Sequence, residues 1–429
     1  TAMPLGIDTP STIGIAYAVM GPAYIATRDA QLTWHIGMAT LFMIGVVKIF
    51  TSFFGGLVQR MIPTAGLLGP LAGIGLMLLG FLPLVEIFNE AVVGMVALGL
   101  IFTTLMSRMQ LPGRMPGVLA AVILGTGIHF ALGFGGYLPE FTAPALDMHF
   151  ALPLPTVEFL KTVPQSMHYL SIAIPFGILT IIGGINNTES ARLAGDDYRT
   201  RDILLTEAFS SLIAAFFGGV AQTTPYIGHP AYKKMGATWW YTLLTGILIG
   251  VCSVVGLLSL FVSLIPRAVI APIFIFIGFE IMRQAYKDSP PAHSPAVSLS
   301  VLPVIASMVL IILGQFMGAA GATPDKLPAR LQVMHQTLTM LSNGFIITGL
   351  LWGSLLAFLI DNKARLAALC AAVCAVFTLF GIIHSVLPTG ELYLPWHIHA
   401  QAHYLTSAGY FALCLILLAL KSSNDKALI

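Results

Sequence analysis

The sequence predicts an all-α polytopic membrane protein built on an inverted repeat. Three observations support this class: an apolar composition, a repeated pattern of landmarks, and a span broken by polar and Pro residues. The 429-residue chain is 57% hydrophobic and only 9% charged, with a mean hydropathy of +0.89. These values lie outside the usual range of soluble domains.

The apolar runs predict the membrane spans in chain order. Most of them are about 20 residues long, enough to cross a hydrocarbon core of about 30 Å. We expect spans at 4–27, 34–54, 58–82, 90–108, 114–136, 168–190, 203–219, 223–235 (broken), 237–262, 267–284, 297–320, 336–360, 364–386 and 404–421.

The Lys and Arg residues orient these spans. One set of alternating loops holds 14 of the 20 Lys and Arg residues, the opposite loops hold 5, and Lys48 lies inside a span. Cytoplasmic loops carry an excess of these residues, so the first set marks the cytoplasmic side. The distribution predicts a cytoplasmic C-terminus and an extracellular or periplasmic loop at 137–167.

Two segments of the chain share the same landmarks. Ile-Pro-x-Ala opens both 62–75 and 265–278, and each segment ends on Ile-Gly at the same offset. Thr9-Pro10 precedes the first copy as Thr224-Pro225 precedes the second. The predicted orientation runs the first copy outward and the second inward, so the repeat is inverted, as in many transporters.

The two copies differ in what precedes them. Two spans, 168–190 and 203–219, come before the second broken element, whereas none comes before the first. This asymmetry predicts that two further N-terminal spans belong to the native protein and are missing from this sequence.

The stretch 223–230, Thr-Thr-Pro-Tyr-Ile-Gly-His-Pro, cannot form a regular membrane helix. Broken segments at membrane depth are tolerated where they line a cavity or are buried in protein. Glu189 ends the apolar run 168–190, and a carboxylate inside a membrane costs about 2.5–3.5 kcal/mol on insertion scales. Together, the two features predict a transporter site near the bilayer midplane.

The chain resembles the nucleobase–cation symporters, the xanthine, uracil and guanine–hypoxanthine permeases, over roughly residues 4–360. MPLGIDTPST is similar to the broken start of that family's third span, and IPTAGLLGPLAGIGL is similar to its fifth. Glu189-Ser190 matches the acidic residue and Thr/Ser of its eighth span. The family's broken tenth span reads Thr-Thr-Tyr-Ile-Glu-Ser, where this chain has Thr-Thr-Pro-Tyr-Ile-Gly-His.

The resemblance implies a seven-plus-seven inverted-repeat transporter fold with core and gate domains and two broken spans. Substrate would lie between the third, eighth and tenth spans. The implied core comprises 1–54 and 168–263, and the implied gate comprises 55–136 and 264–360. The loop 137–167 and an extra pair of C-terminal spans at 361–429 lie outside this plan.

The candidate site residues suit a planar heterocycle. A carboxylate such as Glu189 can accept two N–H bonds at once, Tyr226 can stack on a ring, and His229 can donate to it or relay a proton. Backbone N–H groups at the broken helix starts supply further donors. We expect substrate contacts from Glu189, Tyr226, Gly228, His229, Asp8, Thr9, Thr12 and Asn186, and ion coupling through Glu189, Asp8 and His229.

Structural roles stay open for several of these residues. Glu189 can pair with Arg192 on one helix face, Asp8 can cap a helix, and His229 can hold a structural hydrogen bond. Asn186 can bridge helices instead of binding substrate. Glu207 receives no site assignment, because it lies near a predicted helix start, where the helix dipole favours an acid.

The expected function is secondary active transport of a purine-like nucleobase or similar planar heterocycle, by elevator-like alternating access. A co-transported proton is expected, with Na⁺ as the alternative, and no other cofactor or metal. The main alternative is a transporter of a small anion (bicarbonate, sulfate or a carboxylate) on the same fold. Gly228 favours that alternative, because it replaces the family's second acid. A non-transporting membrane scaffold or receptor is the third hypothesis.

Other classes of protein are disfavoured. The chain has no HExxH motif, nucleophile elbow or paired catalytic carboxylates, so we expect no enzyme. No basic cluster points to nucleic acid. The expected partners are a small-molecule substrate and the lipid bilayer, with a homodimer left open, and the expected location is a bacterial inner membrane.

Overall fold

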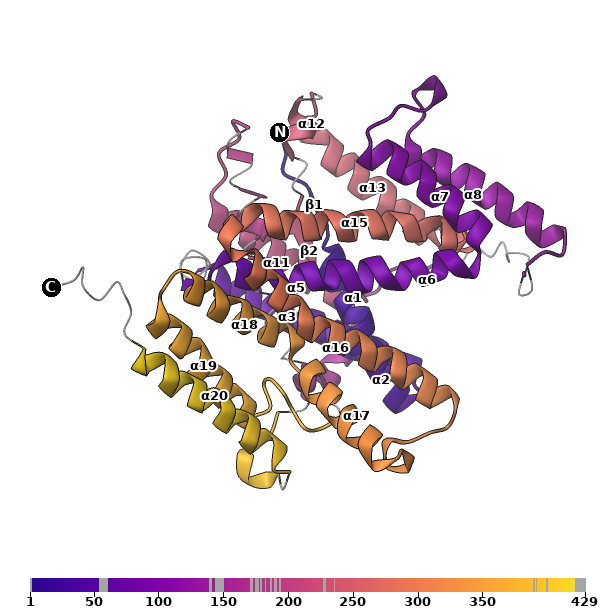
Figure 1. Cartoon of the computed structure of the whole chain (residues 1–429). Coiled ribbons are helices and arrows are strands. Elements are labelled where there is room, and N and C mark those ends of the chain that lie inside the picture. The colour runs from indigo at the N-terminus through magenta and orange to yellow at the C-terminus, as the bar shows by residue number, and fades with distance from the viewer. Residues whose placement is uncertain are drawn as a thin grey trace. The chain divides into compact units, whose positions relative to one another are not determined.

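The computed structural model is almost entirely helical (Figure 1). It divides into two compact units, one of residues 1–2, 75–154 and 236–282, the other of residues 3–74, 155–235 and 283–429. The residues that it describes are 2–53, 61–138, 141–142, 150–169, 173, 177, 180–181, 183–185, 187–188, 191–192, 194–226, 229–234, 236–388, 390, 392–398 and 400–420.

The first half of the chain forms helices that follow the predicted spans closely. A short turn of π-helix, Ala16–Met20, joins α1 and α2, and a second one, Gly75–Phe81, joins α5 and α6 into an apolar span. The helices are α1 (Thr9–Ile15), α2 (Gly21–Thr27), α3 (Ala30–Ser52), α5 (Thr64–Ile74), α6 (Leu82–Asn89), α7 (Ala91–Ile101) and α8 (Gly117–Phe134).

The rest of the chain contains helices of 4 to 26 residues and two sharp bends. Its helices are α9 (Val163–Ser166), α11 (Thr200–Phe216), α12 (His229–Lys234), α13 (Trp240–Val254), α14 (Leu257–Leu264), α15 (Arg267–Asp288), α16 (Ser294–Ala319), α17 (Ala329–Ser342), α18 (Phe345–Ile360), α19 (Ala364–Leu379) and α20 (Ala402–Ala419). Among the described residues, six helices are long and apolar enough to cross a membrane, or up to eight if each bent pair counts as one span.

The two bends correct the expectation of straight spans at 237–262 and 336–360. The first span turns by 78° between α13 and α14, and the second by 74° between α17 and α18. Gly256 and Gly344 lie at these breaks with φ of 77° and 71°. Glycine adopts this left-handed conformation at little cost. Because glycine is also common in apolar runs, the hydropathy of these segments did not reveal the bends.

The two repeated segments, 62–75 and 265–278, contact each other at their last residues. Gly75 and Gly278, the glycines that close the two repeated sequence segments, face each other backbone to backbone. A Cβ on Gly75 would lie 2.7 Å from the carbonyl oxygen of Gly278, and a Cβ on Gly278 would collide with that of Gly75. Equivalent positions of two inverted copies meet each other at the axis that relates them, so the contact is the one that this architecture requires.

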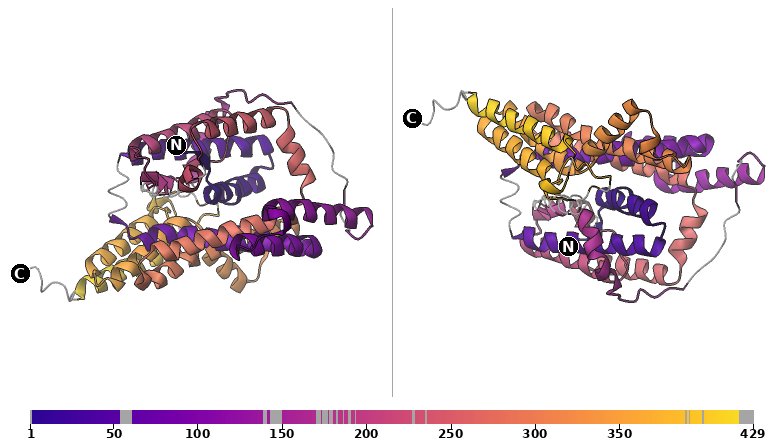
Figure 2. Two further views of the ribbon diagram at one scale, coloured as in Figure 1. Left: turned by 90° about the horizontal axis from the view of Figure 1, so that it is seen from above. Right: turned by 90° about the horizontal axis from the view of Figure 1, so that it is seen from below.

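The C-terminal helices α19 and α20 pack along each other (yellow in Figure 2). Small residues of α19, Ala367 and Ala371, lie against Cys414 and Leu417 of α20, and Phe358 of α18 joins the same cluster. This pair is therefore part of the packed core of its unit.

Candidate functional site

The span that begins before α1 and the broken span 223–235 meet in a two-stranded antiparallel sheet. Strand β1 (Leu5–Ile7) comes directly before α1, and β2 (Thr223–Pro225) comes shortly before α12. Gly6 lies opposite Thr224. The amide of Asp8 donates to Gln222 O at 2.9 Å, and that of Tyr226 donates to Pro4 O at 3.0 Å. The Thr-Pro landmarks of the two repeat copies thus lie at one junction.

The outer edge of β2 is satisfied by side chains. In an antiparallel pair, alternate residues point their N–H and C=O groups away from the partner strand, and within a membrane such groups need another partner. Thr223 N donates to Ser211 Oγ at 3.2 Å, and Thr223 O accepts from Lys48 Nζ at 2.9 Å. Pro225 has no N–H, and its carbonyl accepts from Asn187 Nδ2 at 2.6 Å.

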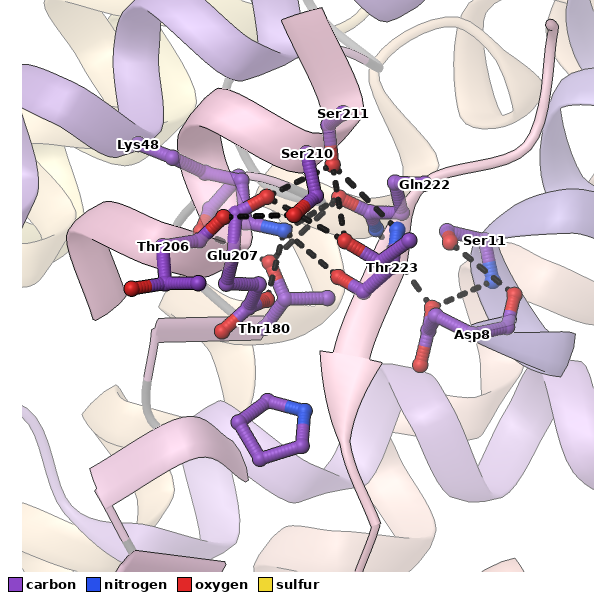
Figure 3. A network of polar contacts seen from close by, with 12 residues as sticks. Asp8, Ser11, Lys48, Thr180, Thr206, Glu207, Ser210, Ser211, Gln222 and Thr223 are labelled. Carbon is purple, nitrogen blue, oxygen red and sulfur yellow. Dashed lines mark hydrogen bonds and ion pairs between the residues drawn. The ribbon is translucent and has the colours of Figure 1, made fainter. Parts of the chain in front are cut away.

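Lys48 is the fully buried cation of this network (Figure 3). Besides Thr223 O, its ammonium donates to Gln222 Oε1 at 3.3 Å and forms an ion pair with Glu207 on α11. An ammonium has three N–H donors, and each of them has an acceptor here. A charge buried in apolar surroundings is tolerated only when it is paired in this way.

Glu207 is also completely buried. Its Oε1 pairs with Lys48, while its Oε2 has no hydrogen-bond partner in the described part of the chain, so the ion pair with Lys48 is its main stabilisation. Its Oε2 lies 3.0 Å from the position that a Cβ on Gly184 would take. The glycine therefore leaves room beside this oxygen.

Asp8 caps the start of α1. Its Oδ2 accepts from the Ser11 amide at 3.0 Å and from Gln222 Nε2 at 3.4 Å. Its carbonyl accepts from Thr12 Oγ1 at 2.7 Å. The Gln222 amide therefore lies between Asp8 on one side and Lys48 on the other, so one side chain separates the two charges. The cap that was left open as an alternative for Asp8 is present in the structure.

His229 begins α12 and is fully buried. Its Nε2 lies 2.8 Å from Asp196 Oδ2, while its Nδ1 has no hydrogen-bond partner within the described residues. Lys233 Nζ lies 3.0 Å from the other oxygen of Asp196. Partial burial alone would raise the pKa of Asp196, but hydrogen bonds from Lys233 and His229, together with the positive charge of the chain terminus, outweigh it and lower the pKa from 3.8 to about 2.

The remaining predicted site residues fall into two groups. Tyr226 is 46% exposed, and its ring lies 5.7 Å from that of Tyr232; Thr9 is the first residue of α1. Glu189, Gly228 and Asn186 lie outside the described residues, so their roles stay predictions. The structure brings Asp8 and Tyr226 together at the sheet junction. It places His229 at the start of α12, the next helix after β2.

Sequence reasoning missed Glu207 and Gln222 as site residues. Glu207 was expected near a helix start, but α11 begins at Thr200, so Glu207 lies two turns inside. The available signal was Lys48, a lysine inside an apolar span, which implies a buried acid somewhere else in the chain. The sequence alone does not say which acid, because the partners belong to different helices.

No protein-family model matches this sequence, and no curated protein matches it. Solved structures do. The transmembrane domain of the bicarbonate transporter BicA from a cyanobacterium is similar, with 19% identity, a TM-score of 0.55, and coverage of 74% of this chain and 85% of that one. SLC26A9 is similar with 11% identity, a TM-score of 0.51, and coverage of 78% and 57%. At these identities, the likeness establishes the fold.

The chain is therefore an all-α polytopic membrane protein with an inverted-repeat transporter fold. The resemblance to the nucleobase–cation symporters is wrong, because the structural neighbours are BicA and SLC26A9 and no family model matches. The reason lies in what the matched motifs do. The Ile-Gly landmarks mark a helix crossing and the Thr-Pro landmarks mark the ends of the sheet. Both are features of the architecture, so a match to them does not distinguish one transporter family from another.

Proposed function

We propose that the protein is a secondary active transporter of a small anion such as bicarbonate, sulfate or a small carboxylate. The observation that carries this proposal is the meeting of both broken spans at the β1–β2 sheet, in a fold similar to that of a bicarbonate transporter. Broken spans of this kind hold the substrate in many secondary transporters.

The sheet junction offers groups that suit an anion. Helical structure starts at Thr9 directly after β1 and continues to Thr27, and backbone N–H groups at a helix start favour negative charge. Beyond β2, the Tyr226 hydroxyl can donate to an oxyanion. As an imidazolium, the buried His229 would also do so through Nδ1, because its Nε2 already donates to Asp196 and its Nδ1 has no partner among the described residues.

The network holds more acidic than basic side chains: Lys48 and Glu207 are buried, and Asp8 is half-buried. Asp8 and Glu207 oppose Lys48, so one negative charge remains when all three are ionised. An entering anion would add another at low dielectric, where like charges repel strongly. We therefore propose that the anion moves together with a cation, as a symporter with H⁺ or Na⁺.

Uptake into proteoliposomes tests this function. Vesicles holding the purified protein are given labelled sulfate, oxalate or bicarbonate, with an inward gradient of H⁺ or of Na⁺. Because CO₂ crosses bilayers unaided, bicarbonate is followed by counterflow at alkaline pH. We expect saturable, gradient-driven accumulation of at least one anion and none of uracil or xanthine. Failure of every anion under both gradients would overturn the proposal.

The substitution Tyr226→Phe tests the position of the site. Loss of a hydrogen bond to a charged partner costs about 1.5–3 kcal/mol, so we expect KM for the anion to rise about tenfold or more. Tyr137→Phe is the matched control, because Tyr137 is 77% exposed and lies in the other unit. An unchanged KM in Tyr226→Phe would remove this residue from the site.

A further inference from the structure

Glu207 differs from the other acids of the network in how it is stabilised. Asp8 Oδ2 receives hydrogen bonds from the Ser11 amide and from Gln222. Glu207 Oε1 pairs with Lys48, whereas Oε2 has no hydrogen-bond donor among the described residues. A proton can thus be added to Glu207 Oε2 without displacing a donor, whereas a proton on Asp8 Oδ2 would compete with the helix cap.

Protonation of Glu207 would change the charge that an anion meets. With Glu207 ionised, its charge cancels that of Lys48, and Asp8 leaves the network with one net negative charge. With Glu207 neutral, the Lys48 charge is free to balance Asp8, and the network is neutral. Lys48 lies next to the junction, since its ammonium donates to Thr223 O of β2 at 2.9 Å.

We propose that Glu207 is the proton-binding site of the transporter and that its protonation releases the charge of Lys48 to support anion binding at the β1–β2 junction. One proton from solution converts the Glu207 carboxylate to the carboxylic acid, and one anion binds with it. A monovalent anion would then cross with no net charge. This inference rests on the proposed function and names its coupling ion and its coupling residue.

Among the residues that the structure describes, few charged groups lie around Glu207. Lys48 faces it from α3, and Asp8, just before α1, acts on it through space. The sheet presents Gln222 and Thr223, and the preceding segment presents Gly184, which carry no charge. On α11 itself, Asp202 is exposed at the helix start. The local balance is therefore set by Glu207, Lys48 and Asp8.

The first experiment needs no variant. Binding is reciprocal, so an anion that binds better to the protonated form must raise the affinity for protons by the same factor. Purified protein in weakly buffered detergent solution, with a pH indicator, is mixed with the anion that the uptake assay identifies. We expect uptake of up to one proton per bound anion. Anion binding with no proton uptake at any pH, or binding that requires Na⁺ instead, would overturn the proposal.

Two variants and a control test whether Glu207 is the residue that binds the proton. Glu207→Gln mimics the protonated state, so it should bind the anion tightly at every pH and take up no proton on binding. Wild-type affinity should approach that of Glu207→Gln at low pH and fall about 5- to 150-fold at high pH, the usual range for coupled sites. The double variant Lys48→Met/Glu207→Gln lacks the released charge and should bind weakly at every pH.

Glu86→Gln is the matched control, because it makes the same change on α6 in the other unit. It should keep the wild-type pH dependence. Wild-type pH dependence in Glu207→Gln would show that the proton binds elsewhere, even if anion transport is intact. Absence of anion binding by the wild type would instead overturn the proposed function, so the two failures are distinguishable. Thermal melting checks that each variant is folded.

Discussion

Asp196 holds α12 in place through two side chains of that helix. His229 lies 2.8 Å from one of its oxygens, and Lys233 lies 3.0 Å from the other. The pKa of Asp196 is lowered to about 2, against an ordinary value of 3.8. A carboxylate with a lowered pKa contributes its full stabilisation above its unfolded value and loses it as the pH falls through the folded value.

We therefore expect Asp196→Asn to destabilise the protein by about 1–3 kcal/mol at neutral pH, since hydrogen bonds to a charged group are lost. The difference from wild type should shrink as the pH falls below about 4 and vanish near pH 2. Melting temperatures measured across this range check the prediction. Asp197→Asn, at the exposed neighbouring position, is the control. A difference that stays constant down to pH 2 would contradict the assignment.

At the scale of elements, the loop between α19 and α20 is attached to the bend between α17 and α18. Asn343 Nδ2 donates to Ser385 O and to Leu387 O, both at 2.8 Å. The backbone N–H of His384 also donates to the backbone carbonyl of Asn343 at 3.0 Å. A helix break exposes backbone groups that need partners, and the C-terminal pair supplies them. These two spans had no assigned role in the sequence, because nothing in an apolar run indicates which neighbour its loop contacts.

His384 extends this attachment through its ring. His384 Nδ1 lies 3.1 Å from Met340 O, and Nε2 lies 2.8 Å from the Tyr410 hydroxyl, which also accepts from Trp352 Nε1 at 2.7 Å. A single arrangement satisfies all of these atoms: a neutral imidazole donates to Met340 O and accepts from Tyr410. The chain of bonds joins α17, α18 and α20 through one side chain.

We expect Asn343→Ala to destabilise the unit that contains it. The substitution leaves the carbonyls of Ser385 and Leu387 without their donor, at a cost of about 1–3 kcal/mol for each unpaired buried group. Hydrogen exchange should rise in 381–388 before the rest of the molecule changes. Asn89→Ala, at the exposed end of α6, is the control. Equal exchange in the two variants would mean that the loop is held by its other contacts.

At the scale of the whole molecule, the crossing of Gly75 and Gly278 allows a direct test of the repeat. An added methyl at either position meets the opposite backbone, which cannot move aside as a side chain can. We expect Gly75→Ala and Gly278→Ala each to lower stability by about 1–3 kcal/mol, the usual cost of overpacking. Gly99→Ala, on α7 with open space around it, should leave stability unchanged or raise it. Tolerance of both alanines would contradict the close crossing.

The sequence predicted the architecture better than the site. Composition indicated the membrane class, and the Ile-Gly landmarks indicated the repeat. That Gly75 and Gly278 cross each other became visible only in the structure. The charge network was harder to predict. Lys48 and Glu207 become partners only when α3 and α11 pack together, and periodicity within one helix contains no information on that pairing. Substrate class was inferred from motifs that serve packing, so that inference failed.

The two-stranded sheet has a consequence for how the protein is made. Leu5 pairs with Pro225, so β1 leaves the ribosome about 220 residues before its partner strand. At about 5–20 residues per second, β1 waits for roughly 10 to 40 s with its hydrogen-bonding edge open. During this interval the polar edge must stay in the translocation channel, at the membrane surface, or against a helper protein. The sheet can therefore form only after about half of the chain has been made, and a chain interrupted before β2 cannot form it.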